Sequence, residues 1–157
     1  MIAAALLILT AQASAIPKVI VTVREPGQVA VVAGGEAEAR LTATVAEGFR
    51  IQANPAAEPF LIPASLDLED DERVRVGPIG YPPGKPHRLR GADSDLSIYE
   101  GTVQIRIPLE ASRSALDGKS VEVLLEGVLR YQACNDVVCL KPASVEVSLP
   151  VRIQPQH

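Results

Sequence analysis

Alternation of apolar and polar residues with a period of two is the feature that most constrains this fold. Apolar side chains occupy every second position over residues 103–109 and again over 145–153. This period places successive side chains on opposite faces of an extended chain, so it predicts β-strands with one buried face. Further segments that favour strands are residues 19–23, 29–32, 37–45, 49–51, 66–68, 74–76 and 121–131.

Turn-forming residues separate these segments. The chain has 13 prolines and 11 glycines among 157 residues, which excludes a helical bundle because both residues disrupt helices. Seven to nine short strands with turns between them predict an all-β protein, and an immunoglobulin-like β-sandwich is the expected topology. The length suits one domain, residues 16–157, preceded by a removable segment.

Three local predictions follow from the turn signals. The polar stretch 69–72 is expected to be a turn that lets Val74 and Val76 pair back on the strand at 66–68. Residues 54–63 hold three prolines and are expected to be irregular. Residues 77–95 form the longest stretch without periodicity, and loops of this length are often functional.

Charge and composition exclude several function classes. A net charge of -4 without a cluster of lysines or arginines argues against a nucleic-acid surface. The acidic stretch 69–72 lacks the spacing of an EF-hand loop. With only two cysteines and two histidines, no metal site is predicted and no cofactor is expected. His87 has no identifiable partner for catalysis and is taken as a loop residue.

The first fifteen residues are predicted to be a signal peptide. Residues 2–9 are apolar but too few to span a bilayer, and Ala13-Ser14-Ala15 matches an A-x-A cleavage pattern. Cleavage after Ala15 would deliver the mature chain to an oxidising compartment, where a disulfide can persist. The alternative is a buried strand or helix at the N-terminus. No later segment is long and apolar enough to cross a membrane.

The two cysteines are the most informative residues. Cys134 and Cys139 are five positions apart, and Asn135-Asp136 between them is a turn signal. Two cysteines that face each other across such a hairpin can reach the Cα separation of a disulfide, roughly 5.5 Å. A loop this short stabilises a fold by only about 2 kcal/mol in the chain-entropy model.

Three interpretations of this pair stay open from the residues alone. A small disulfide near the surface can be a redox centre, because exposed disulfides are the labile ones. It can equally be a passive hairpin disulfide, and zinc binding is a weaker third reading because further ligands are scarce. The charge of Asp136 should raise the pKa of a nearby thiol, and Arg130 and Lys141 are the candidates to offset it.

The sequence around the cysteines resembles a known family. YQACNDVVCLKP, residues 131–142, is similar to the active-site hairpin of the N-terminal periplasmic domain of DsbD, the thiol:disulfide interchange protein. GFRIQANPAAEPFLIPASLDLE, residues 48–69, and SIYEGTVQIRIPLE, residues 97–110, resemble two further blocks of the same family in the same order. The resemblance extends over nearly all of the mature chain.

This resemblance implies a fold and an activity. It implies an immunoglobulin-like sandwich that carries the cysteine pair in a hairpin at one end. The domain would accept electrons from a thioredoxin-like domain and pass them to oxidised periplasmic proteins. Carried over by position, Cys139 would form the mixed disulfide with a partner, Cys134 would resolve it, and Tyr131 would flank the site.

Two departures from the family pattern shape the expectations. Family members cover the disulfide with a loop that carries an aromatic residue, whereas the corresponding stretch here, residues 88–96, has none. Leu89, Leu96 and Tyr81 are therefore the candidates to cap the site. Full-length DsbD also continues into a membrane domain and a thioredoxin-like domain. Because this chain stops after one domain, a membrane electron donor is expected to act in trans.

The sequence thus supports two functions from different classes. The first is a periplasmic protein-disulfide reductase, a thiol:disulfide exchange domain. By the resemblance, its partners would be thioredoxin-fold proteins of disulfide isomerisation or cytochrome c maturation, and it is expected to be a monomer. The second is a non-catalytic exported sandwich for binding or assembly, in which the hairpin disulfide is structural.

Overall fold

The fold is all-β, as the computed structural model shows for residues 16–89, 93–114 and 118–156, the part of the chain that it describes. Its strands within those ranges are β1 (Val21–Arg24), β2 (Val29–Val32), β3 (Glu36–Val45), β4 (Arg50–Gln52), β5 (Ser65–Leu68), β6 (Val74–Val76), β7 (Lys85–His87), β8 (Leu96–Tyr99), β9 (Thr102–Ala111), β10 (Val121–Tyr131), β11 (Ala133–Cys134) and β12 (Ala143–Gln154). They form three four-stranded sheets.

The first sheet has the order β1-β3-β9-β6. Its centre is the antiparallel pair of β3 and β9, where Ala39 lies opposite Ile107 and Leu41 opposite Ile105. Both strands are ten residues long and bury every second residue. The period-two pattern of the sequence therefore marks the inner face of this sheet.

The second sheet has the order β2-β12-β10-β5. Strands β10 and β12 run antiparallel over eleven paired positions, with Leu125 opposite Leu149. Strand β5 adds to the free edge of β10. Strand β2 joins β12 in parallel, with Val29 opposite Val151, so the beginning and the end of the domain are neighbours in one sheet.

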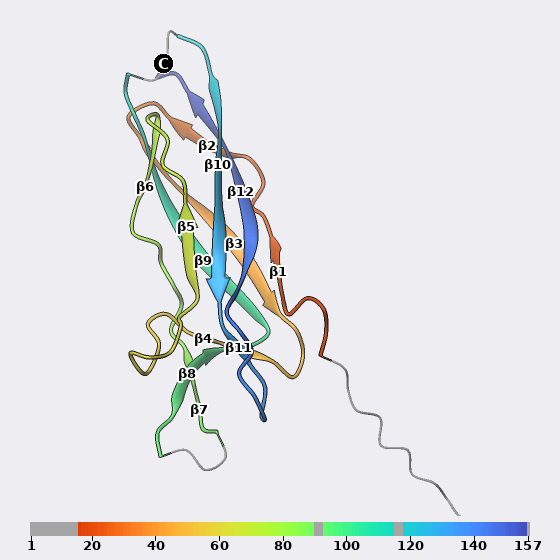
Figure 1. Cartoon of the computed structure of the whole chain (residues 1–157). Coiled ribbons are helices and arrows are strands. Elements are labelled where there is room, and N and C mark those ends of the chain that lie inside the picture. The colour runs from red at the N-terminus through yellow and green to blue at the C-terminus, as the bar shows by residue number, and fades with distance from the viewer. Residues whose placement is uncertain (1–15, 90–92, 115–117, 157) are drawn as a thin grey trace, which may run out of the picture.

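The inner faces of these two sheets pack against each other in an immunoglobulin-like sandwich (Figure 1). The predicted fold class is confirmed. Burial of apolar side chains between the sheets stabilises the fold, because each large side chain removed from water contributes roughly 1.5–3 kcal/mol. The largest apolar side chains that are fully buried are Leu41, Ile51, Ile105, Ile107, Leu109, Leu125, Leu129, Leu149, Ile153, Val21 and Val74.

A third sheet, β11-β4-β8-β7, lies at one end of the sandwich (Figure 1). Strand β4 is central to it, since it pairs with β11 on one side and β8 on the other. Ile51, Gln52 and Ala53 are buried in succession, so both faces of the chain are covered here. The cysteine hairpin extends from this sheet at its β11 edge.

Two sequence predictions about pairing were wrong. Strands β5 and β6 do not form a hairpin: β5 pairs with β10 and β6 with β9, in opposite sheets. The polar stretch between them carries the chain across the sandwich. The region 77–95 is also not free of strands, because β7 pairs there with β8 and Gly80 bridges to Arg106. The irregular stretch predicted for residues 54–63 is confirmed.

The predicted signal peptide, residues 1–15, lies outside the described residues. In the part of the chain that the structure describes, no helix is long and apolar enough to cross a membrane.

Candidate active site

Cys134 and Cys139 are joined by a disulfide, with an S–S distance of 2.02 Å. The two residues form an antiparallel bridge, and backbone hydrogen bonds close the ladder on both sides of them. The Leu140 amide donates to the Ala133 carbonyl at 2.8 Å. The cysteines thus occupy a non-hydrogen-bonded pair, the position where opposite Cα atoms come closest, about 4.5 Å in ordinary sheets. Their Cα atoms are 3.9 Å apart, closer than the sequence suggested.

The turn between the cysteines is fixed by Asn135. Its side-chain oxygen accepts hydrogen bonds from the amides of Val137 and Val138, both at 2.8 Å, and its own amide donates to the Val138 carbonyl at 3.0 Å. Asparagine favours turns because its side chain can replace backbone partners in this way. The hairpin is therefore closed by hydrogen bonds as well as by the disulfide.

The two cysteines differ in exposure. Cys134 is 3% exposed, whereas Cys139 is exposed. Tyr131, also predicted to belong to the site, is buried at the end of β10 as part of the core. A reagent or protein that approaches from solvent therefore meets Cys139 first, while Cys134 faces the interior.

Gln52 contacts the buried sulfur from strand β4. Its side-chain amide nitrogen donates to Cys134 Sγ at 3.8 Å, and its side-chain oxygen is buried without a hydrogen-bond partner. The sequence pattern did not indicate this residue, because a glutamine after an apolar strand position is expected to face water. The only available signal was that Gln52 lies within the motif block at residues 48–69.

Arg50 places a positive charge beside the hairpin. Its backbone lies opposite Cys134 in the β4–β11 pair, and its guanidinium binds Asp136 at 2.8 Å and approaches Glu100 at 3.9 Å. Lys85 lies 3.5 Å from the same Glu100. A chain of alternating charges thus runs from β7 to the hairpin turn.

This charge chain changes one electrostatic expectation. Arg50, not Arg130, is the cation that binds Asp136, and Arg130 pairs with Asp67 instead. The Arg50 side chain is only 20% exposed, whereas that of Asp136 is 75% exposed. Within this ion pair, the positive charge of Arg50 is therefore better shielded from water than the negative charge of Asp136.

The three candidate cap residues occupy different places. Tyr81 packs against the core, and its hydroxyl accepts a hydrogen bond from the Leu66 amide at 2.8 Å. Burial raises the pKa of Tyr81. Leu96 begins β8 opposite His87, and Leu89 follows β7; both are half-buried. Residues 90–92 lie outside the described residues, so capping of the disulfide stays a prediction.

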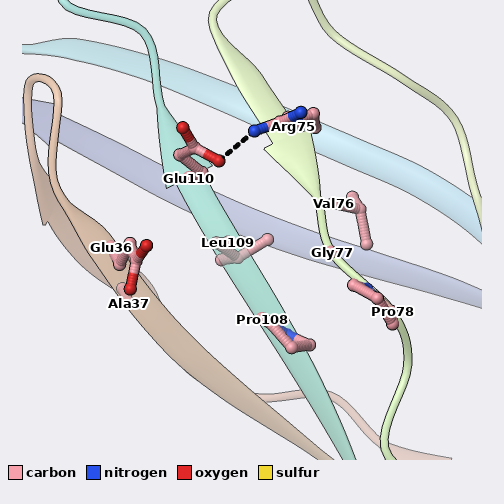
Figure 2. Close-up of a pocket in the computed structure, with 9 residues that line it drawn as sticks. All are labelled: Glu36, Ala37, Arg75, Val76, Gly77, Pro78, Pro108, Leu109 and Glu110. Atoms are coloured by element: carbon pink, nitrogen blue, oxygen red, sulfur yellow. Dashed lines mark hydrogen bonds and ion pairs between the residues drawn. The ribbon is translucent and has the colours of Figure 1, made fainter.

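Other parts of the described chain offer less chemistry. A cavity of about 400 Å³ lies at the end of β3 and β9 that is remote from β4 (Figure 2). Arg75 and Glu110 form an ion pair at its edge, but no thiol or imidazole lines it. Among the described residues, no three His, Cys, Asp or Glu side chains cluster as metal ligands would.

Comparisons with known proteins identify the family. No curated protein matches the chain. The solved N-terminal periplasmic domain of ScsB from Proteus mirabilis superposes with a TM-score of 0.56 at 16% identity, covering 83% of this chain and 46% of that chain. This chain therefore spans about half the length of that structure.

A second solved structure is the N-terminal domain of Neisseria meningitidis DsbD in its reduced form, with a TM-score of 0.41 and 15% identity, covering 74% of this chain and 79% of that one. The family model for the N-terminal part of the thiol:disulfide interchange protein DsbD matches residues 19–150. This match covers both cysteines and all or part of every strand described above, and the chain belongs to the family of DsbD N-terminal domains.

Proposed function

We propose that this domain is an electron relay that exchanges its Cys134–Cys139 disulfide with thiols of thioredoxin-fold partners. Family membership supports thiol:disulfide interchange in general. The observation that carries the specific proposal is the difference between the two cysteines, one exposed and one buried. An exposed sulfur can be attacked by a partner, and a buried one is protected from side reactions until the bond opens.

The exchange conserves electrons in each step. A partner thiolate attacks Cys139 Sγ, a mixed disulfide forms, and the electron pair of the broken bond leaves on Cys134. A second thiolate of the partner then attacks the mixed disulfide, so the partner is oxidised and Cys139 is released. The reduced pair passes its two electrons to an oxidised protein by the reverse sequence.

The hairpin also supplies a surface for docking. Val137 is 91% exposed and Val138 is 46% exposed, and both directly precede Cys139. Exposed apolar side chains next to a reactive sulfur suit a partner that presents its own cysteine within an apolar rim. We further propose that the protein is exported to the periplasm after cleavage at Ala15 and acts there as a monomer.

The first experiment is the reduction potential of the Cys134–Cys139 couple. Purified protein would be equilibrated in thiol/disulfide buffers and its free thiols counted. A relay predicts a value between about -270 mV, as in thioredoxin, and about -180 mV, as in protein disulfide isomerase. A bond that stays oxidised until the domain unfolds would contradict the relay.

The second experiment traps the mixed disulfide. Cys134→Ala leaves the exposed Cys139 without its resolving partner. We expect this variant to accumulate a covalent adduct with thioredoxin when that protein is activated as a mixed-disulfide donor. Cys139→Ala is the matched control, and it should form far less adduct because Cys134 is buried. Equal trapping by both variants would refute the assigned roles.

The alternative function is a binding or assembly module with a structural disulfide. It predicts a potential below about -300 mV and loss of the fold when the bond is reduced. The Asn135 hydrogen bonds favour the relay instead, since they close the same turn as the disulfide and do not involve its sulfurs.

A further inference from the structure

Gln52 is the one polar residue that is fully buried in the described part of the chain, with 1% exposure. Its amide nitrogen points at Cys134 Sγ at 3.8 Å, and its amide oxygen has no partner. A buried polar group without a partner destabilises a fold, and each such group in a native structure calls for an explanation.

The backbone around Gln52 holds its side chain in this place. The backbone N–H of Gln52 donates to the Gln132 backbone carbonyl at 3.4 Å, and the backbone carbonyl of Gln52 accepts from the Ala64 N–H at 3.0 Å. Strand β4 is thus tied to the cysteine hairpin on one side and to the chain before β5 on the other. Gln52, Arg50 and Cys134 lie on one face of the third sheet, because Arg50 is opposite Cys134 and two residues from Gln52.

We propose that Gln52 is a residue of the redox site, whose side-chain N–H stabilises Cys134 as a thiolate once the disulfide opens. A disulfide sulfur is a weak hydrogen-bond acceptor. A thiolate carries a full charge, and charge-assisted hydrogen bonds are roughly twice as strong as neutral ones. The contact therefore gains strength on reduction, when a buried thiolate has lost most of its water.

The position of Gln52 matches the exchange step. When a partner thiolate attacks Cys139, the S–S bond breaks and its electron pair leaves on Cys134. The N–H of Gln52 already points at this leaving sulfur, so it lowers the free energy of the departing thiolate. In the return step the same thiolate attacks Cys139 and expels the partner. This inference rests on the proposed function for its biological meaning. The quantity that it concerns, however, is the equilibrium between the disulfide and the dithiol of Cys134 and Cys139.

The test replaces Gln52 by methionine, which has a similar length and no N–H. Because Gln52 favours the reduced pair, Gln52→Met should shift the equilibrium in thiol/disulfide buffers about tenfold toward the disulfide. This shift corresponds to a potential about 30 mV more negative. Gln132→Met is the matched control: Gln132 lies next to the hairpin and donates to the Leu140 carbonyl at 3.3 Å. The reduction potential of the Gln132→Met variant should equal that of the unmodified protein.

A second readout isolates the thiolate. In a Cys139→Ala background, the ultraviolet absorbance of the Cys134 thiolate is titrated with pH, with and without Gln52→Met. The midpoint should move to higher pH in the double variant. Gln52→Leu serves in both measurements if the methionine variant does not fold. Unchanged potential and unchanged midpoint in a folded Gln52 variant would overturn the proposal.

The two proposals fail in different ways. If Cys134→Ala traps no thioredoxin but Gln52→Met still shifts the potential, the relay is wrong and the role of Gln52 stands. If trapping succeeds while both Gln52 readouts stay unchanged, the relay stands and the role of Gln52 is wrong.

Discussion

The two large sheets and the small third sheet are stabilised by different kinds of interaction. Between the large sheets, residues such as Leu129, Leu149 and Ile107 are fully buried and purely apolar. In the third sheet, the residues around the disulfide include the buried amide of Gln52 and the charge chain through Arg50. The sandwich is held together by apolar packing, whereas the end that carries the disulfide also holds buried polar and charged groups.

This difference separates folding from reactivity. Apolar packing has no dependence on whether the disulfide is open, whereas the partners of Cys134 change their interactions when its sulfur gains a charge. Changes in the sandwich should therefore alter the free energy of unfolding and leave the potential unchanged. Changes around the hairpin should alter the potential and have a smaller effect on the free energy of unfolding.

The largest effect is expected from Leu149→Ala in the middle of β12. Leu149 is fully buried opposite Leu125, and truncation of such a leucine leaves a cavity that costs about 2–5 kcal/mol. Urea denaturation of the oxidised protein measures the loss. The potential of the folded variant should be unchanged, and a shift would show that the sandwich and the hairpin are coupled.

A smaller loss is expected when both cysteines are replaced by alanine. The closed loop contains six residues, so its removal should cost about 2 kcal/mol in the chain-entropy model. The Asn135 hydrogen bonds should retain the turn. Chemical denaturation and circular dichroism check this expectation, and loss of the fold would instead favour a structural disulfide.

Gln52→Met, unlike the two changes above, should stabilise the oxidised protein. The substitution removes the unpaired side-chain oxygen, so the free energy of unfolding should rise by about 1 kcal/mol. Urea denaturation of the variant beside Gln132→Met provides the comparison. A clear loss of stability would mean that Gln52 is a structural residue.

The smallest effect concerns pH and the turn between β5 and β6. Side-chain hydrogen bonds from Arg73 lower the pKa of Asp71, against a smaller opposing effect of burial. A lowered pKa stabilises the fold above the unfolded-state value, and this contribution is lost as the pH falls through the folded-state value. Asp71→Asn should cost up to about 1 kcal/mol at neutral pH, and the difference should vanish in acid. A difference that persists in acid would assign the effect to the backbone hydrogen bond of the turn.

The sequence predicted the strands better than their partners. The period of two correctly assigned the inner faces of β3, β9 and β12, because one face of each is buried and the other is exposed. It could not show that β5 and β6 belong to opposite sheets, since alternation identifies a face and not a neighbour. Strand β7 contains Lys85 and Pro86 and has no alternation at all.

The cysteine pair of the site was also predictable, but the residues around it were not. Short spacing and a turn signal suffice to bring Cys134 and Cys139 together. Gln52 and Arg50 are more than eighty residues away in sequence, and only the pairing of β4 with β11 places them beside the sulfur. Gln52 also violates the alternation rule, because both faces of the chain are covered there.

The parallel pairing of β2 with β12 determines the order in which this domain can fold. Val29 pairs with Val151. The second sheet can therefore be completed only after nearly the whole domain has been synthesised. Contacts this distant in sequence slow folding, because a long loop must close before they form. The hairpin needs only six neighbouring residues, so the entropy cost of closing its loop is small. The contact between the two cysteines therefore depends on far fewer distant residues than the pairing of β2 with β12 does.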